Sequence, residues 1–504
     1  MHLSVLLVSL FACNGSGEVG SRVLETPSIT SGTQSGTGSA TSSTDPASQG
    51  GRPEGLVVNA VTFNQGVELF MVENARPVDP EVPLVSGRPA WVRVFLDVDD
   101  DTWEERDISG VLTVTSGGDT VVYDDVSTIR ADSQRDTKRT TLNFEIDGNM
   151  IDEDSVYELD VLEVDPERGG GKKKDTSWSS SDNFVLVGRT DTVEVVILPI
   201  QYDADGSGRL PDTSPAQIER IADLFYSMYP VEDVVITVAD PSPWPYAINP
   251  DGSGWGELLD AVSDARTSSG AGDNVYFYGL FTPEDRFDQF CQWGCVLGLS
   301  YLAYSPRDVW ARASIGVGWT GDTTSETLVH EVGHAHGREH APCGVYDWDR
   351  NYPHNNGDIS AWGYDLITKE MFSPSTKDMM GYCSPIWISD YTYMALFQRI
   401  RDLGPDGLTP LEETRWPSFT VDADGVATRR GREVPVRGLP GGTVVDVELL
   451  DGAGGVIDVR RGWVLPYGHV SGGRVVVDAG DDVAALRLLD PTVVQRETVL
   501  HYVD

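Results

Sequence analysis

Three histidines and one glutamate stand at spacings that suit a metal-dependent hydrolase. His330 and His334 are four residues apart, and His340 follows them after Gly337. Four residues of an α-helix rise about 6 Å and return to nearly the same face, so His330 and His334 can bind one metal ion. Gly337 tolerates the left-handed conformation that ends a helix, which lets the chain turn and bring His340 to the same ion. Three protein ligands with an open position are typical of catalytic zinc, whereas a structural site is usually closed by four.

Glu331 lies next to the first of these ligands, on the adjoining helical face. Its carboxylate can take a proton from a metal-bound water without binding the metal itself. Zinc would lower the pKa of that water and polarise a peptide carbonyl, and Glu331 would pass the proton to the leaving amine. His336 points away from the ligand face and is expected behind the ligands or at the surface. His354, in a Gly/Asn-rich loop, is expected to be solvated.

The elements that must position these residues alternate between strands and helices. Strands are predicted at 193–200, 234–238, 274–281 and 313–317, and helices at about 214–228, 258–265 and 389–403. The helix that carries His330 is predicted to begin near Thr323, because Thr323 and Glu326 match a capping box. Such alternation predicts a mixed α/β domain with a mostly parallel sheet.

The region from about 192 to 404 resembles the metzincin zinc endopeptidases. The resemblance is carried by the long motif HEVGHAHGREH at 330–340 and by Asp378-Met-Met-Gly-Tyr382, which looks like the clan's Met-turn. It implies a metzincin-like catalytic domain with a mixed sheet and an active-site helix. It also implies that Met380 lies beneath the zinc and that Tyr382 helps to stabilise the oxyanion. The alternative for Met380 and Tyr382 is that both are ordinary core residues.

Regions of short alternating strands flank this domain. Ala90 to Leu96 and Val111 to Thr115 are examples on the N-terminal side, and Val444 to Leu450 is one on the C-terminal side. The pattern predicts an immunoglobulin-like β-sandwich at 55–190, the zinc protease domain at 191–415 and a small β-domain at 416–504.

The first residues resemble a bacterial lipoprotein signal. Leu3 to Ala12 is apolar and precedes Cys13, so residues 1–13 are predicted to be the signal, with Cys13 as the lipidated residue. Residues 14–54 are rich in Ser, Thr and Gly and are predicted to form a flexible linker. The alternative is a disordered tail with an incidental cysteine. Either interpretation predicts an exported protein, secreted or held at the cell surface or outer membrane through Cys13.

Four further cysteines, Cys291, Cys295, Cys343 and Cys383, favour disulfides in an exported protein, and three pairings are possible. Cys343 lies three residues past His340, and Cys383 three past Met380, so both are expected near the metal site. Pairing them would close a loop of about 40 residues, worth roughly 4 kcal/mol in the chain-entropy model. Cys291 and Cys295 would then be a local pair.

Composition excludes several classes of partner. The net charge is −42, which argues against binding nucleic acid or anionic lipid through a basic face. A run of 18 apolar residues is absent from the sequence, so a lipid at Cys13 is the expected membrane attachment. Asp203, Asp205 and Ser207 resemble half of an EF-hand loop, but its twelfth position is Ser214 and lacks the bidentate glutamate. A turn is favoured there, and Ca²⁺ is kept as a weaker alternative cofactor beside Zn²⁺.

Two function hypotheses follow. The leading one is a secreted or surface-anchored zinc endopeptidase, acting as a monomer, that cleaves extracellular proteins or glycoproteins through a zinc-activated water. The alternative is a surface adhesin or glycan-binding protein with a vestigial metal site. The intact Glu331 and the complete ligand set favour the enzyme, since a binding protein does not need a general base.

Overall fold

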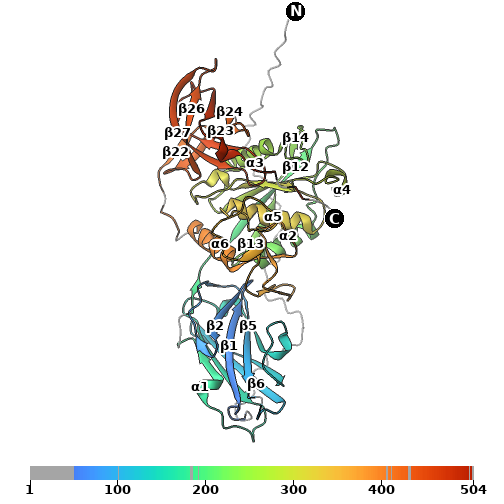
Figure 1. The fold of residues 1–504 in the computed structure, drawn as a ribbon, viewed down its shortest axis with the longest axis vertical. Helices are drawn as coiled ribbons and strands as arrows, with labels where there is room; N and C mark the ends of the chain where they lie inside the picture. Colours follow the sequence, from blue (N-terminus) through green and yellow to red (C-terminus); the bar gives the residue numbers. More distant parts are fainter. Residues whose placement is uncertain are drawn as a thin grey trace, which may run out of the picture.

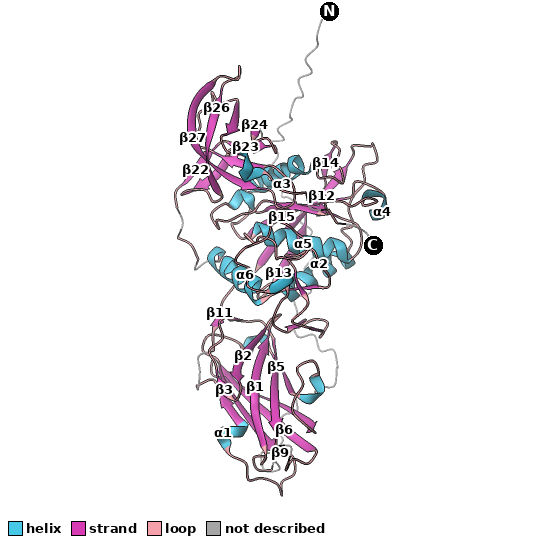
Figure 2. Ribbon diagram, viewed as in Figure 1, coloured by secondary structure: helices cyan, strands magenta, loops and turns pink. Residues whose placement is uncertain are grey.

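The structure is a computed structural model of the 504-residue chain. It describes residues 50–99, 101–181, 185–190, 192–404, 407–409, 411–429, 433–498 and 500–501. The predicted signal with Cys13 and residues 14–49 of the predicted linker lie outside these ranges. The fold is mixed α/β, rich in strands and divided among several sheets, with α2, α3, α5 and α6 in the middle of the molecule (Figures 1 and 2). Within the described ranges, helices are all too short or too polar to cross a membrane.

Two antiparallel sheets form the N-terminal part of the chain. Their strand orders are β3-β2-β1-β5-β8 and β10-β9-β6-β7. The strands are β1 (Leu56–Asn64), β2 (Glu68–Glu73), β3 (Arg76–Pro77), β5 (Ala90–Val98), β6 (Arg106–Ser116), β7 (Asp119–Ile129), β8 (Leu142–Ile146), β9 (Val156–Glu163) and β10 (Ser177–Ser179). Burial alternates along β6 and β9 of the second sheet, and buried residues of both sheets belong to one hydrophobic cluster, so the two sheets face a shared core.

The structure describes the chain from Gly50, which lies within the predicted linker 14–54. Gly50 N–H donates to the Glu163 carbonyl at 2.9 Å, and Arg52 pairs with Asp160 of β9 at 2.5 Å. Residues 50–54, which the sequence assigns to the linker, are therefore bonded to the N-terminal sheets. A short parallel pair, β4 (Leu84–Val85) with β11 (Val187–Gly188), and the one-turn helix α1 (Lys173–Thr176) complete this part.

The central sheet has the order β13-β12-β15-β17-β16, with β14 also beside β12. Its strands are β12 (Val193–Tyr202), β13 (Val234–Val238), β14 (Ser242–Trp244), β15 (Val275–Phe281), β16 (Gly298–Ser300) and β17 (Ala313–Val317). All pairs are parallel except β16 with β17, so the predicted mostly parallel sheet is confirmed and carries one antiparallel edge strand.

Helices cover both faces of this sheet. All seven residues of β15 are buried, as expected for a strand covered on both sides. Tyr276 and Tyr278 of β15 pack with α2 (Pro215–Met228) and α5 (Asp322–Ala335), while Phe277 packs with α3 (Trp255–Ser269) on the other face. The chain also forms α4 (Phe287–Phe290), β18 (Gly363–Tyr364), β19 (Met371–Phe372), β20 (Lys377–Asp378), β21 (Ile386–Trp387) and α6 (Asp390–Leu403).

The start of α5 differs from the prediction. The helix begins at Asp322 with Gly321 as N-cap, and no side-chain cap hydrogen bond is formed there, so the capping box of Thr323 and Glu326 was wrong. Instead, the Gln217 side chain of α2 accepts from Gly321 N–H at 2.8 Å. A tertiary contact thus replaces the local cap, because α2 and α5 lie side by side.

The C-terminal part is a closed barrel with the order β23-β24-β29-β26-β27-β28. Its strands are β23 (Ser418–Val421), β24 (Val426–Arg429), β26 (Thr443–Leu450), β27 (Val456–Pro466), β28 (Gly473–Val476) and β29 (Ala485–Leu488), and β22 (Glu413–Trp416) pairs with β25 (Val434–Arg437) beside it. Single 3-10 turns occur at Lys138–Thr140, Gly148–Met150, Val309–Ala311, Asn355–Gly357 and Pro491–Val494.

The barrel is docked on the central part through a shared core. Leu465, Tyr467 and Val476 of the barrel belong to the same buried cluster as Leu258 and Val262 of α3. This packing directs the loop between β27 and β28, residues 467–472, into the central part of the molecule.

Candidate metal centre

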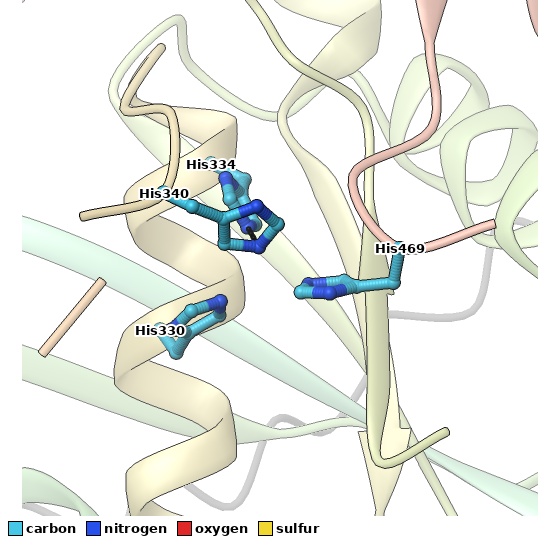
Figure 3. Close-up of side chains that lie close together, drawn as sticks. All are labelled: His330, His334, His340 and His469. Atoms are coloured by element: carbon cyan, nitrogen blue, oxygen red, sulfur yellow. Dashed lines mark hydrogen bonds between the residues drawn. The ribbon is translucent and has the colours of Figure 1, made fainter. Parts of the chain in front are cut away.

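Four buried histidines meet between α5 and the barrel. They are His330, His334, His340 and His469, and one ring nitrogen of each lies within 4.8 Å of the others. Figure 3 shows His330 and His334 on α5, His340 on the segment after it, and His469 reaching in from the opposite side. His469 comes from the loop between β27 and β28, so the barrel contributes to the site.

The backbone places the three predicted ligands as the motif requires. The rings of His330 and His334, one helical turn apart, have centroids 4.8 Å from each other. The helix ends at Ala335, and Gly337 follows with φ of +86°. A Cβ at that position would lie 2.7 Å from the Ala303 carbonyl oxygen, so only glycine fits the turn. The ring of His340 then comes within 4.7 Å of that of His334.

Hydrogen bonds at Nδ1 orient these three rings. His330 Nδ1 lies 2.8 Å from the Met379 carbonyl oxygen, and His334 Nδ1 lies 2.6 Å from that of Arg338. His340 Nδ1 lies 3.2 Å from the Asp347 carbonyl oxygen. A carbonyl only accepts, so each Nδ1 carries the proton and each Nε2 presents a lone pair.

The Nε2 atoms fit a metal ion. His330 Nε2 is buried and has no hydrogen-bond partner among the described residues. The Nε2 atoms of His334 and His340 face each other at 3.2 Å. Two lone pairs so close repel unless a cation lies between them, and neutral imidazole nitrogen is a preferred zinc ligand. Burial lowers the pKa of His330 to about 4 and holds those of His334 and His340 well below 6.5, so the rings stay neutral.

Glu331 and Tyr382 lie against the fourth histidine. Glu331 is 1% exposed, and its Oε1 is 2.9 Å from His469 Nε2. The Tyr382 hydroxyl bonds to His469 Nδ1. The ring centroid of Tyr382 is 5.5 Å from those of His330 and His340. Burial raises the pKa of Glu331 to about 8.

Met380 packs against α5, next to Gly333. A Cβ at Gly333, one residue before His334, would lie 2.5 Å from Met380 Sδ. Asp378 holds the turn that carries Met380, because its carboxylate accepts from Met380 N–H at 2.8 Å and from Ser389 N–H at 3.0 Å. These two hydrogen bonds therefore fix the turn that positions Met380 and Tyr382 beside the histidine cluster.

Both disulfides of the leading pairing are present. Cys343 and Cys383 are joined across 40 residues, and Tyr382 N–H donates to the Cys343 carbonyl at 2.8 Å. This bond links the segment after His340 to the segment that carries Tyr382. Cys291 and Cys295 form the local pair.

A cavity of about 110 Å³ lies beside the cluster. Its lining includes Gly298 of β16, Thr327 and Glu331 of α5, Tyr382, Ser384 and His501. A Cβ at Gly298 would come within 2.4 Å of Glu331 Oε1, so the edge strand lies directly against that carboxylate. The cavity is large enough to hold a small side chain next to Glu331 and Tyr382.

The remaining residues considered in the sequence lie outside the cluster. His336 is 2% exposed, its ring stacks on that of Tyr276 at 4.3 Å, and its Nδ1 is bonded to the Val332 carbonyl. It is a core residue rather than a surface one, because α5 turns that face to the central sheet. His354 bonds to Asp390 at 2.5 Å, and Asp205 pairs with Arg209 at 2.6 Å.

The sequence prediction did not include His469. It stands far from the motif in Pro466-Tyr-Gly-His-Val-Ser-Gly472, a loop between strands without metal-ligand spacing. The only available signal was a histidine in a glycine-containing turn, and such a residue is usually solvated.

Comparison with known proteins supports a metallopeptidase. Residues 311–384 match the family model described as Peptidase M66, and this range holds α5, three of the clustered histidines and Tyr382. No curated protein matches the chain. Among solved structures, the chain is similar to metalloproteinase-II from Bacteroides fragilis, with 13% identity, 63% of this chain and 84% of that chain covered and a TM-score of 0.23. The family match and the four-histidine cluster together indicate a metal site that suits zinc.

Proposed function

We propose that this chain is a zinc-dependent endopeptidase of metzincin type. The observation that carries the proposal is the convergence of imidazole Nε2 atoms beside the buried carboxylate of Glu331, within the range that matches a peptidase family. His330, His334 and His340 would hold the zinc. A zinc ion so held supplies Lewis acidity, which acidifies water and polarises a carbonyl group.

Glu331 has the position of a general base. Its Oε2 is buried and has no hydrogen-bond partner among the described residues, so it is free to accept a proton from an attacking water. It would then pass that proton to the leaving amine. The Tyr382 hydroxyl can donate to the carbonyl oxygen as that oxygen gains negative charge. Gly298 lets β16 lie directly against Glu331, because a side chain at that position would collide with the carboxylate. A substrate backbone added along β16 would therefore lie close to the general base.

The same proposal covers the setting of the enzyme. The disulfides support an exported protein, secreted or attached through a lipid at Cys13, because such bonds persist in oxidising surroundings. We assign residues 55–190 to an immunoglobulin-like domain and residues 416–504 to a β-domain flanking the protease unit, which acts as a monomer. The substrate class is protein or glycoprotein.

Replacement of the general base tests the proposal. Glu331→Ala should keep one bound zinc per chain and the fold while losing nearly all peptide hydrolysis, since general base catalysis contributes roughly 100-fold to 10,000-fold. Casein cleavage, with and without a chelator, and metal analysis measure both properties. Glu219→Ala, at an exposed position of α2, is the matched control and should behave as the unaltered protein. If the unaltered protein cleaves casein, cleavage by Glu331→Ala at the same rate would overturn the mechanism.

One observation favours the second candidate, a binding protein with a vestigial metal site. Four protein ligands are typical of a closed structural site, and four histidines meet here. Incubation with a mucin-like glycoprotein separates the candidates. Chelator-sensitive cleavage supports the peptidase, and tight binding without cleavage under any activating condition supports the adhesin.

A further inference from the structure

We infer that His469 is a fourth metal ligand, supplied by the barrel, and that the peptidase is latent in this conformation until the loop 467–472 leaves the site. The latency part rests on the proposed function, because only an enzyme can be held inactive. The His469 imidazole contacts Glu331, Tyr382 and the rings of the three predicted ligands.

His469 is an equal member of the cluster by distance. Its ring centroid lies 5.2 Å from that of His330, 5.0 Å from that of His334 and 4.8 Å from that of His340. The rings of the predicted ligands lie 4.7 to 5.5 Å from one another. Its Nδ1 is hydrogen-bonded to the Tyr382 hydroxyl, and its Nε2, like that of His330, is buried without a hydrogen-bond partner among the described residues. With Nδ1 as the donor to the hydroxyl oxygen, Nε2 keeps a lone pair for a metal ion. Four imidazoles would supply the number of protein ligands that a closed zinc site takes.

The His469 imidazole contacts both residues to which the proposed function gives catalytic roles. Its Nε2 lies 2.9 Å from Glu331 Oε1, and its Nδ1 is hydrogen-bonded to the Tyr382 hydroxyl. In this position the His469 ring would compete with an attacking water for the space between Glu331 and Tyr382. The Glu331 carboxylate and the Tyr382 hydroxyl, the proposed general base and oxyanion donor, therefore both lie against His469.

The loop also covers the edge of the central sheet. Gly468 N–H donates to the Ser300 carbonyl at 3.0 Å, and Leu302 N–H donates to the Pro466 carbonyl at 3.2 Å. Tyr301 and Tyr467 form an antiparallel bridge. An exposed strand edge is where an extended peptide can add by backbone hydrogen bonds. The barrel loop takes that place beside the metal site, in the manner of a bound peptide.

A C-terminal segment fastens the loop. Ser471 Oγ donates to the Arg496 carbonyl at 2.7 Å and accepts from Arg496 N–H at 3.0 Å, and the Arg496 side chain pairs with Asp347. His501 then bonds by both backbone groups to Cys295, at 2.8 and 2.7 Å. Because Arg474 anchors the barrel through buried contacts to α3, the loop and this segment are the parts that must move to open the site.

Metal coordination tests the ligand without relying on activity. X-ray absorption of the zinc-loaded full-length protein should count four imidazole ligands, and His469→Ala should retain zinc with three imidazoles and one further light atom. The visible spectrum of the cobalt-substituted protein should change in the same comparison. His354→Ala removes a histidine outside the cluster and should leave both spectra unchanged. Three imidazoles in the unaltered protein, or the same count in His469→Ala, would overturn the assignment.

Hydrolysis of a fluorogenic peptide library tests the latency. His469→Ala should raise hydrolysis by roughly tenfold or more, because activity scales with the fraction of molecules whose site is open. Where alanine prevents folding, as judged by near-UV circular dichroism, His469→Gln keeps a polar group for Tyr382 but offers an amide, a poor zinc ligand. Equal or lower hydrolysis by a folded, zinc-loaded variant would overturn latency.

The two proposals fail in different ways. If His469→Ala loses one imidazole and gains hydrolysis, adding Glu331→Ala to that variant should abolish the gain, which supports both proposals. If the imidazole count falls but no variant hydrolyses any peptide, the proposed function fails and the fourth ligand stands. If the unaltered protein already hydrolyses peptides at the rate of His469→Ala and depends on Glu331, the proposed function stands and latency is overturned.

Discussion

The four clustered histidines share one pattern of hydrogen bonding. Each uses Nδ1 for a bond within the protein, to a carbonyl for His330, His334 and His340 and to a tyrosine hydroxyl for His469. The carbonyl partners select the tautomer of the first three, with Nδ1 protonated and a lone pair on Nε2. Spacing along the chain identified the first three, because two lie one turn apart on α5 and the third follows the turn at Gly337. Nothing in the spacing distinguishes His469 from a solvated histidine, because its partners lie on other elements.

His336 is predicted to support the fold and not the metal. His336→Ala should keep one zinc per chain, because its ring stacks on Tyr276 away from the cluster. It should lower stability by roughly 2 to 4 kcal/mol, the usual range for a large side chain removed from a core. Metal analysis and the midpoint of urea unfolding measure the two effects. Loss of zinc without loss of stability would contradict this assignment.

At the scale of elements, neighbouring segments decide how the site is held. The start of α5 is capped by Gln217 of α2 rather than by its own Thr323 and Glu326. The turn that carries Tyr382 is bonded to the segment after His340 through Cys343. Both contacts join segments far apart in the chain, so local sequence rules found the elements but not the bonds between them.

The Cys343–Cys383 bond should contribute more stability than the local pair. Replacing both cysteines by serine should lower the free energy of unfolding by roughly 4 kcal/mol, since the bond closes a separation of 40 residues. The Cys291/Cys295 double serine variant is the matched control, with an expected loss of about 2 kcal/mol for a separation of four. Thermal unfolding of the two variants side by side checks the order, and a larger loss from the local pair would contradict it.

At the scale of the whole molecule, the barrel and the central part share a core and buried polar contacts. Arg474 of β28 is 1% exposed and reaches Asp264 Oδ1 at 3.0 Å and Ser263 Oγ at 3.0 Å, both on α3. These contacts set the position of the barrel and therefore that of His469. The site is thus composed of two parts of the chain that the sequence places in different domains.

Arg474→Met is expected to loosen this junction. Removing one partner of a buried ion pair costs roughly 3 to 5 kcal/mol, because the carboxylates of α3 lose their counter-charge. Backbone hydrogen exchange should increase in residues 467–472 and in α3. Arg487→Met, which removes an exposed pair with Glu448 on the same barrel, is the control and should leave the loop protected. Equal exchange in both variants would show that Arg474 does not anchor the barrel.

The sequence by itself determined the three-histidine motif with its glutamate, the mostly parallel central sheet and the strand-rich flanking regions. Helical periodicity and the conformational freedom of Gly337 are local properties of the backbone, so residue types and spacing were enough to predict them. Only the tertiary structure decided that the last strands close into a barrel and that its loop brings His469 to the cluster. That contact depends on the packing of the barrel against α3, and the free energy of such packing comes from surfaces assembled from the whole chain rather than from any one stretch of it.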